Sequence, residues 1–294
     1  MLSNFERGGL GCWGVRRAAP TASGTSALLR FNTNWLKGGR SNFKFTLSAA
    51  VPGRPNAWTP AARGTVVLLH GYGVAQFAMV PWALRLAQEG WRCVLVDLRG
   101  HGKSTGRRIY FGVQEARDLS QLLDRLVRDD EMATPVAVIG ESYGAALALR
   151  WKAAEPRVGS VVAIAPYAIL SNAVLNVCHE YAAGLPQALV KLGLRRLPSV
   201  LKVEPGQLDT VTVLARSPVV ALFVAGAEDK ITPVAEVRRL YRAAAPGSEL
   251  IVVPGATHEA VTYFFNDLTP PVLAWLDGKS GGRRSESGSQ NQQP

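Results

Sequence analysis

The sequence predicts an α/β fold with a mostly parallel, doubly wound sheet that helices cover on both faces. Two observations carry this prediction: short apolar runs alternate with helical patterns, and none of the runs alternates polar with apolar residues. A strand that is apolar on both faces belongs inside a parallel sheet. Hydrophobic residues form 47% and charged residues 19% of the 294 residues, a balance typical of a globular chain.

Six apolar runs are the predicted strands, in chain order 65–70, 93–97, 136–140, 161–165, 221–225 and 250–253. A shorter run at 43–47 predicts a further edge strand. The segments between the runs predict helices at 81–89, 113–128, 143–154, 233–245 and 259–276. The first helix has Pro81 near its start and Gly90 at its stop, as helices often do. Right-handed crossovers between successive strands then place helices on both faces of one sheet.

One interval is too long for a simple connection between strand and helix. Residues 167–216 carry short helical patterns broken by prolines, and we expect an insertion that forms a small cap and shapes a pocket. Its apolar residues are expected mainly in the core of this cap. They are Ile169, Leu170, Val174, Leu175, Val177 and Leu189. His179 and Glu180 are expected to form a solvated pair.

The two ends differ from the body in composition. Residues 1–40 predict a flexible basic leader, 41–277 the folded domain, and 278–294 a disordered tail. Of the formal net charge of +11, residues 1–44 carry +6 and 278–294 carry +2. The body is therefore nearly balanced, and no basic run is interleaved with aromatic residues. This pattern argues against nucleic acid as a partner.

The chain also lacks the signals of a membrane or exported protein. No window approaches 18 uninterrupted apolar residues, so we expect no stable membrane insertion. The Arg16-Arg17 pair is not followed by the hydrophobic stretch of an export signal, which predicts a cytoplasmic location. Three widely spaced cysteines give neither a disulfide framework nor metal-site spacing; they are Cys12, Cys93 and Cys178.

A candidate nucleophile lies between the predicted strand 136–140 and the predicted helix 143–154. The segment Gly140-Glu141-Ser142-Tyr143-Gly144 matches the Gly-x-Ser-x-Gly pattern of a nucleophile elbow. The serine of such an elbow sits on a strained turn with little room, which requires small residues on both sides. An incidental serine in a Gly-rich turn is the alternative. The position favours the nucleophile, because ligands of doubly wound sheets collect at the carboxyl ends of strands.

A serine hydroxyl needs a base, and the base needs an orienting acid. Of the four histidines, only His258 follows the last predicted strand and comes after both Ser142 and a strand-end acid. That acid is Asp229, directly after strand 221–225, while its neighbour Glu228 is expected to be a surface carboxylate. The chain order serine, acid, histidine belongs to one of three folds that carry such a triad.

Backbone amides are expected to stabilise the oxyanion that develops in acyl transfer. One donor is the N–H of Tyr143, directly after the nucleophile. The other comes from the loop His70-Gly71-Tyr72-Gly73, where the N–H of Tyr72 is preferred to that of Gly73. His70 itself is expected to shape this loop by hydrogen bonding rather than to transfer protons.

Together these motifs resemble the α/β-hydrolase superfamily. The segments that carry the resemblance are His70-Gly-Tyr-Gly73, Asp97-Leu-Arg-Gly-His-Gly-Lys-Ser104, Gly140-Glu-Ser-Tyr-Gly144, Gly226-x-x-Asp229 and His258. Within the superfamily the chain is similar to esterase and monoacylglycerol-lipase-like (serine aminopeptidase-type) members, from about residue 63 to 276. The resemblance implies an eight-stranded sheet, a cap at 167–216, and acyl transfer to water with no cofactor or metal. It also implies structural roles for Asp97, His101 and Ser104.

The predicted function is therefore hydrolysis of small-molecule carboxylic esters with short- to medium-chain acyl groups, or of monoacylglycerol-like esters. Two alternatives are left open. One is an amide, thioester or aminopeptidase-type hydrolase on the same three residues, and the other is a non-catalytic ligand-binding relative. Aminopeptidase action needs an acidic pocket for a free amine, for which the cap offers Glu180, Glu204 and Asp209.

Overall fold

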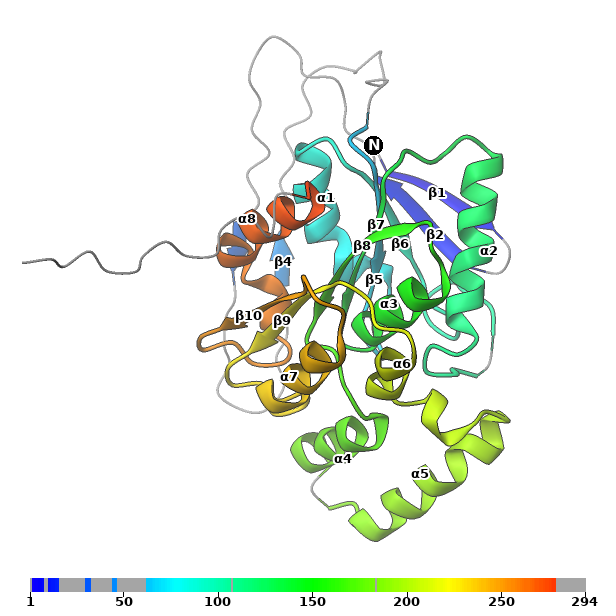
Figure 1. The fold of residues 1–294 in the computed structure, drawn as a ribbon, viewed down its shortest axis with the longest axis vertical. Helices are drawn as coiled ribbons and strands as arrows, with labels where there is room; N and C mark the ends of the chain where they lie inside the picture. The colour runs from blue at the N-terminus through cyan, green and yellow to red at the C-terminus, as the bar shows by residue number, and fades with distance from the viewer. Residues whose placement is uncertain are drawn as a thin grey trace, which may run out of the picture.

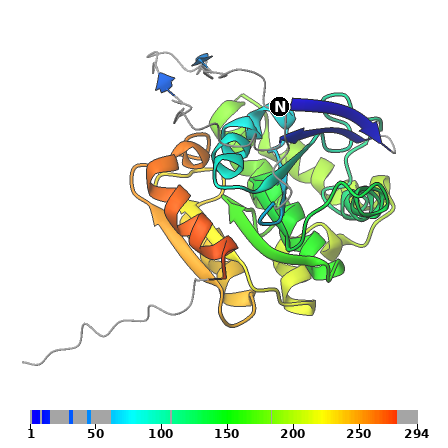
Figure 2. The same ribbon diagram turned by 90° about the horizontal axis from the view of Figure 1, so that it is seen from above.

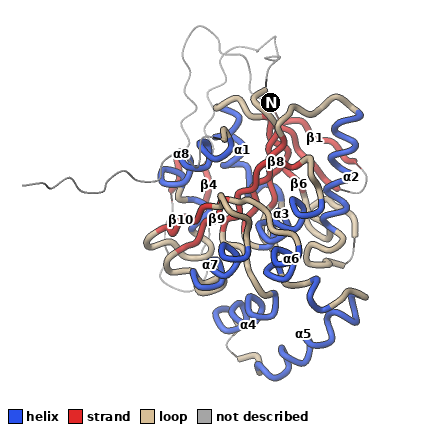
Figure 3. The backbone as a smooth tube through the Cα atoms, in the orientation of Figure 1, coloured by secondary structure: helices blue, strands red, loops and turns tan. Residues whose placement is uncertain are grey.

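The architecture is that of a computed structural model of the chain (Figures 1 and 3). The structure describes residues 2–7, 10–15, 30–32, 44–46, 62–106, 108–182 and 184–278. In the first four of these ranges only the backbone is described. The predicted disordered tail lies outside the described residues apart from Gly278, and so does most of the predicted leader.

Eight strands form one mostly parallel sheet in the order β1-β2-β6-β5-β7-β8-β9-β10. The six strands from β5 to β10 pair in parallel with one another, and β2 pairs antiparallel with β6 and with β1. The strands are β1 (Leu2–Arg7), β2 (Leu10–Val15), β5 (Thr65–Leu69), β6 (Arg92–Val96), β7 (Val136–Glu141), β8 (Val158–Ile164), β9 (Leu222–Gly226) and β10 (Glu249–Val253). The predicted α/β class and the eight-stranded sheet are thus confirmed.

Helices cover both faces of this sheet (Figure 2). The helices of the two layers are α1 (Val80–Gln88), α2 (Glu115–Arg128), α3 (Tyr143–Ala154), α6 (Thr210–Arg216), α7 (Val234–Ala243) and α8 (Phe265–Leu276). Because side chains alternate along a strand, Val66 and Leu68 of β5 pack with α1 and α8, whereas Val67 and Leu69 pack with α2 and α3. Two short 3-10 helices, η1 (Gln76–Met79) and η3 (Val261–Tyr263), precede α1 and α8, so the helix predicted at 259–276 is interrupted.

The N-terminal strands differ from the prediction. Residues 1–40 were expected to form a flexible leader, but β1 and β2 form a hairpin at the edge of the main sheet. The open edge of β6 offers β2 the backbone partners that its N–H and C=O groups require. The run at 43–47, predicted as an edge strand of the main sheet, does form a strand, β4 (Lys44–Thr46). It pairs instead with β3 (Arg30–Asn32) in a separate two-stranded sheet.

The insertion at 167–216 forms the cap and then returns to the core. Helices α4 (Leu170–Tyr181) and α5 (Gln187–Leu201) project beyond the sheet at the bottom of Figure 1. A 3-10 turn, η2 (Pro205–Gln207), leads to α6, which packs against α3 and α7. The projecting part of the insertion is therefore α4 with α5. Among the described helices, none combines the length and the apolar character needed to cross a bilayer.

Candidate active site

Ser142 lies on a sharp turn between β7 and α3. Its φ of +51° and ψ of −111° are sparsely populated for a residue with a side chain, at a cost of about 1–3 kcal/mol. The Ser142 N–H donates to the carbonyl of Ile164 at 2.8 Å, which fixes the turn against β8. A Cβ at Gly140 would overlap the backbone of Gly144, and a Cβ at Gly144 would overlap the carbonyl of Leu69. The close approach of α3 to β5 and β7 therefore requires both glycines.

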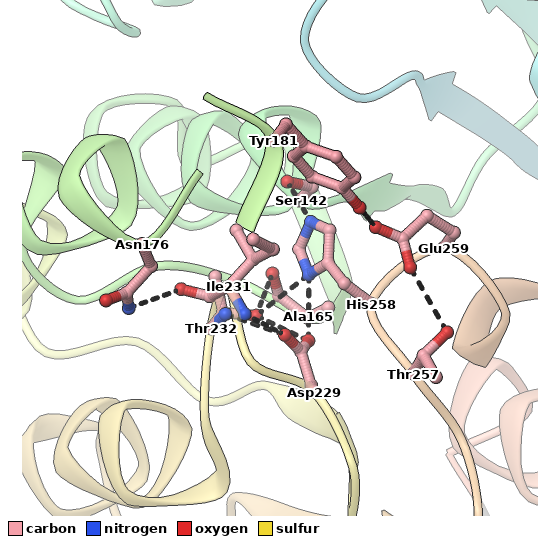
Figure 4. A network of polar contacts seen from close by, with 10 residues as sticks. All are labelled: Ser142, Ala165, Asn176, Tyr181, Asp229, Ile231, Thr232, Thr257, His258 and Glu259. Carbon is pink, nitrogen blue, oxygen red and sulfur yellow. Dashed lines mark hydrogen bonds and ion pairs between the residues drawn. The ribbon is translucent and has the colours of Figure 1, made fainter. Parts of the chain in front are cut away.

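The loops after β9 and β10 bring an acid and a base to this turn (Figure 4). His258 Nε2 lies 2.9 Å from Ser142 Oγ, and His258 Nδ1 lies 2.8 Å from Asp229 Oδ2. With the Nδ1–H donating to the carboxylate, Nε2 is free to accept the serine proton. The structure thus brings together the three side chains predicted from the sequence, while Glu228 is exposed as expected.

Asp229 is held by its own loop. Its Oδ1 accepts from the N–H of Ile231 at 2.8 Å and from the N–H of Thr232 at 2.7 Å. The Thr232 hydroxyl lies 2.8 Å from Oδ2 and 3.1 Å from the carbonyl oxygen of Ala165. Burial alone would raise the pKa of Asp229, but its contact with His258 and the Thr232 donors lower that pKa. The carboxylate is therefore both ionised and fixed in direction.

Burial and the neighbouring carboxylates act in opposite directions on the pKa of His258. Burial alone would lower the pKa of His258, but the hydrogen bond and charge of Asp229 raise it above the ordinary value of 6.5. The carboxylates of Glu259 and Glu141 add smaller contributions in the same direction. The site therefore favours the imidazolium that forms when the imidazole takes a proton.

The two residues predicted to supply oxyanion donors, Tyr72 and Tyr143, lie beside Ser142 at the cavity. Tyr143 is the first residue of α3, so its N–H lies among the four that a helix start leaves without an intrahelical acceptor. Tyr72 lies in the turn after β5, and both residues line the same cavity as Ser142. Neither N–H donates to any of the residues that the structure describes. These are the two amides predicted as oxyanion donors.

The segment around Asp97 supports the loop that carries Tyr72. The buried carboxylate of Asp97 accepts from the N–H of Gln76 at 2.8 Å, and the Ser104 hydroxyl donates to the Asp97 carbonyl. His101 Nε2 accepts from the N–H of Gly73 at 3.2 Å. These contacts are structural, which agrees with the role that the resemblance implied for the segment.

His70 joins two loops at the base of the site. It is fully buried, its Nδ1 lies 2.7 Å from the Gly71 carbonyl, and its Nε2 accepts from the N–H of Leu98 at 3.0 Å. Burial lowers the pKa of His70 to about 4, so the ring stays neutral. His70 therefore holds the loop by hydrogen bonds, as expected, and does not contact Ser142.

A cavity of about 980 Å³ lies above Ser142, between the core and the cap. Its wall is mainly apolar and comes from loops of the core and from both cap helices. The predicted cap residues Leu170, Val174 and Val177 line it. Leu175 lines a second cavity of about 460 Å³ between α4 and α5. Leu189 lines neither cavity and is 61% exposed, so its expected place inside the cap is wrong.

Two carboxylates, those of Glu141 and Glu259, also line the cavity beside Ser142 and His258. Glu141 Oε2 is buried and has no hydrogen-bond partner among the described residues. Burial raises the pKa of Glu141 to about 7, the charge of His258 opposes the rise, and Glu259 adds to it. The cavity therefore holds one acidic group that changes charge near neutral pH.

Helix α4 ties the cap to the two loops that carry the acid and the base (Figure 4). Asn176 donates to the carbonyl of Ile231 at 3.0 Å, and the Tyr181 hydroxyl donates to Glu259. Glu180 forms an ion pair with Lys230 at 3.3 Å rather than the predicted pair with His179. Opposite charge explains this correction, because lysine and glutamate side chains attract each other and Lys230 lies within reach of Glu180.

The described residues offer no group of three or more His, Cys, Asp or Glu placed to hold a metal ion. Cys93 is buried in β6, where burial raises the pKa of its thiol, and Cys178 lies in α4. Neither thiol lines the cavity around Ser142.

Comparison with known proteins places this arrangement in a family. A family model described as serine aminopeptidase, S33, matches residues 60–209, which is 150 of the 294 residues. The chain belongs to the serine aminopeptidase S33 family. The match contains the Ser142 elbow of this S33 protein and both cap helices, but it ends before Asp229 and His258.

The S33 protein is similar to a monoacylglycerol lipase of Mycolicibacterium smegmatis, with 28% identity over 264 residues that cover 75% of this chain and 91% of the relative. It is also similar to a solved esterase structure from Pyrococcus furiosus, with 26% identity and a TM-score of 0.62 over 74% of this chain and 82% of that one. A monoacylglycerol lipase of Paleococcus ferrophilus shares the fold at 23% identity, with a TM-score of 0.53 over 74% and 96% of the two chains.

Four residues of the S33 site were missed in the sequence. Thr232 follows Asp229 by three residues, the spacing of a local turn held by an acidic side chain, so this signal was readable. Glu141 occupies the variable position of the elbow motif, and Glu259 directly follows the predicted base. Tyr181 had no local signal, because its partner is 78 residues away in the chain.

Proposed function

We propose that the S33 protein is a serine hydrolase that cleaves carboxylic esters through an acyl-serine intermediate. The observation that carries this proposal is the line of contacts from Ser142 Oγ to His258 Nε2, at 2.9 Å, and from His258 Nδ1 to Asp229, at 2.8 Å, at the floor of a mainly apolar cavity. The names of two relatives, a monoacylglycerol lipase and an esterase, support the same chemistry.

The acylation step uses the three side chains in turn. His258 Nε2 takes the Ser142 proton while Oγ attacks the ester carbonyl carbon. The carbonyl electron pair moves to oxygen, where the N–H groups of Tyr72 and Tyr143 stabilise the negative charge. Asp229 stabilises the imidazolium, which then gives its proton to the leaving alcohol oxygen as the carbon–oxygen bond breaks.

Deacylation repeats the sequence with water. His258 Nε2 removes a proton from a water molecule that attacks the acyl carbon, and the second oxyanion forms at the same two amides. When it collapses, the bond to Ser142 Oγ breaks and the imidazolium returns the proton to the serine. The products are the carboxylic acid and the unmodified enzyme.

The cavity supports esters with short- to medium-chain acyl groups, including monoacylglycerol-like esters. Its volume of about 980 Å³ is at the upper end for small-molecule sites. Apolar side chains of α4 and α5 line the part under the cap, where an acyl chain would be buried. Within the proposed range, the room available favours the medium-chain end over butyrate.

The deciding experiment is an acyl-length series of nitrophenyl esters on wild type and Ser142→Ala, together with fluorophosphonate labelling. We expect labelling at Ser142 and a loss of turnover of about 10⁶-fold in the variant. A folded wild-type protein that hydrolyses esters without labelling at Ser142 would contradict the proposal. No ester turnover, combined with thermal stabilisation by ester analogues, would indicate a ligand-binding relative instead.

The acidic residues of the cavity support aminopeptidase-type hydrolysis as a second candidate function. The sequence pointed only to acidic residues of the cap, but Glu141 and Glu259 line the cavity itself and would attract a free amine. The same triad can attack an amide carbonyl. Amino-acid anilides assayed beside nitrophenyl esters separate the two activities, and a higher kcat/KM on anilides would make the peptide substrate the principal one.

A further inference from the structure

The outer side of cap helix α5 carries exposed aliphatic side chains. Leu189, Leu192 and Val200 are 61%, 50% and 57% exposed. At 3.6 residues per turn these three positions fall on one side of the helix, while Leu194 and Leu197 fall on the side that lines the cavity above Ser142. Helix α5 is thus apolar on two sides, and only the inner side has a partner within the described residues.

The same helix is strongly basic. It carries Lys191, Arg195 and Arg196, all exposed, and it contains no acidic residue. Lys191 and Arg195 also border the cavity of about 460 Å³ between α4 and α5, whereas Arg196 lines neither cavity. None of the three forms an ion pair with another described residue. A partner that covers this side of α5 must therefore combine negative charge with an apolar interior.

An anionic lipid surface has that combination, because phosphate head groups lie directly above acyl chains. Helices with aliphatic residues on one side and Lys or Arg beside them bind such surfaces in the plane of the interface. Helix α5 also lies at the far end of the cap from the sheet, where no other described element covers it (Figures 1 and 3).

We propose that the outer side of α5 is an interfacial surface that binds anionic bilayers peripherally. Leu189, Leu192 and Val200 enter the head-group region, and Arg195 and Arg196 contact lipid phosphates. Because Leu194 and Leu197 of the same helix line the cavity, binding in this position brings the cavity close to the lipid. The proposal concerns binding and goes beyond the proposed ester hydrolysis.

The test is co-sedimentation of the full chain with vesicles of phosphatidylcholine, with and without phosphatidylglycerol. We expect binding to the vesicles that contain phosphatidylglycerol, weakened by salt, and binding at least about tenfold weaker to neutral vesicles. Leu189→Glu with Leu192→Glu, and Arg195→Glu with Arg196→Glu, should each weaken binding by at least about tenfold. The matched control reverses two exposed arginines of α2, Arg117→Glu with Arg128→Glu, and should bind as the wild type does.

Three results would overturn the proposal: no binding by wild type, equal binding to neutral vesicles, or binding that survives in both α5 variants. A wild-type dimer that the leucine variants abolish, without vesicle binding, would assign this surface to a second copy of the chain and would also overturn it. Hydrolysis of a water-soluble butyrate ester should be unchanged in the α5 variants, because none of the four residues lines the Ser142 cavity. Ser142→Ala should bind vesicles as the wild type does, so a failure of this proposal can be told apart from a failure of the proposed catalysis.

Discussion

Asp229 decides which nitrogen of His258 carries the proton. Its carboxylate can only accept, so the proton stays on Nδ1 and the lone pair of Nε2 faces Ser142. Asp229→Asn offers an amide that can donate to Nδ1 and so favours the tautomer with its proton on Nε2. We expect kcat/KM on nitrophenyl butyrate to fall about 10⁴-fold in this variant. The control Glu228→Gln, at the exposed neighbour, should have the kcat/KM of wild type.

The pH profile of the same variant gives an independent check. Asp229 raises the pKa of His258 above 6.5, so the wild-type kcat/KM should be lost as pH falls through a value above 6.5. In Asp229→Asn the effect of burial, which favours the neutral ring, is opposed only by the smaller contributions of Glu259 and Glu141. The variant should therefore lose kcat/KM at a lower pH than wild type does. Loss at the same pH in both proteins would mean that Asp229 does not set the charge of His258.

Glu141 makes stability depend on pH near neutrality. Its pKa is raised from 4.5 to about 7, so the folded chain keeps a proton that the unfolded chain releases. Between these two values the free energy of unfolding should fall as pH rises. Glu141→Gln removes this loss, so the variant should have the higher Tm above pH 7 and the same pH dependence as wild type below pH 4.5. Identical pH dependence of Tm in both proteins over the whole range would contradict this assignment.

At the scale of elements, the start of α3 is packed so tightly against β5 that it tolerates only glycine. A Cβ at Gly144 meets the carbonyls of Leu69 and His70, which belong to backbone that cannot move aside. We expect Gly144→Ala to lower the free energy of unfolding by about 3 kcal/mol or more, measured by urea denaturation. Gly193→Ala in α5 is the matched control, because no atom lies near its Cβ position. It should stabilise the chain by up to about 1 kcal/mol.

The central strands could be predicted because each is apolar on both faces, a pattern typical of strands inside a parallel sheet. The hairpin of β1 and β2 was missed although the sequence holds a signal for it. Residues Arg7 and Leu10 pair across the intervening Gly8-Gly9, and a two-glycine connection is typical of a tight hairpin. The surrounding excess of Gly, Ala, Ser and Arg concealed it, because composition favoured an unstructured segment.

For the molecule as a whole, the contacts of α4 hold the cap over the core. The double variant Asn176→Ala, Tyr181→Phe loses the hydrogen bonds from α4 to Ile231 and to Glu259. We expect limited proteolysis to cleave the connection between α4 and α5 several-fold faster, and KM for medium-chain esters to rise. Ser199→Ala, on an exposed part of α5, is the control and should be cleaved at the wild-type rate. Unchanged cleavage in the double variant would show that apolar packing alone holds the cap.

The reacting side chains could be predicted, since each follows a strand and so has a local signal. Ser142, Asp229 and His258 all lie just beyond the carboxyl ends of parallel strands, which topology brings to one edge. The cavity wall could not be predicted in the same way. Leu189 and Leu194 have the same side chain five residues apart, and only the packing of α5 places one outside and the other inside.

The position of His258 after β10, the last strand along the chain, has a consequence during synthesis. Ribosomes make the elbow long before they make β10, and the first half of the sheet can fold in the meantime. Until β10 joins β9, no imidazole lies beside the serine hydroxyl, which by itself is a weak nucleophile. We therefore expect the nascent protein to be unreactive toward esters until the sheet is complete.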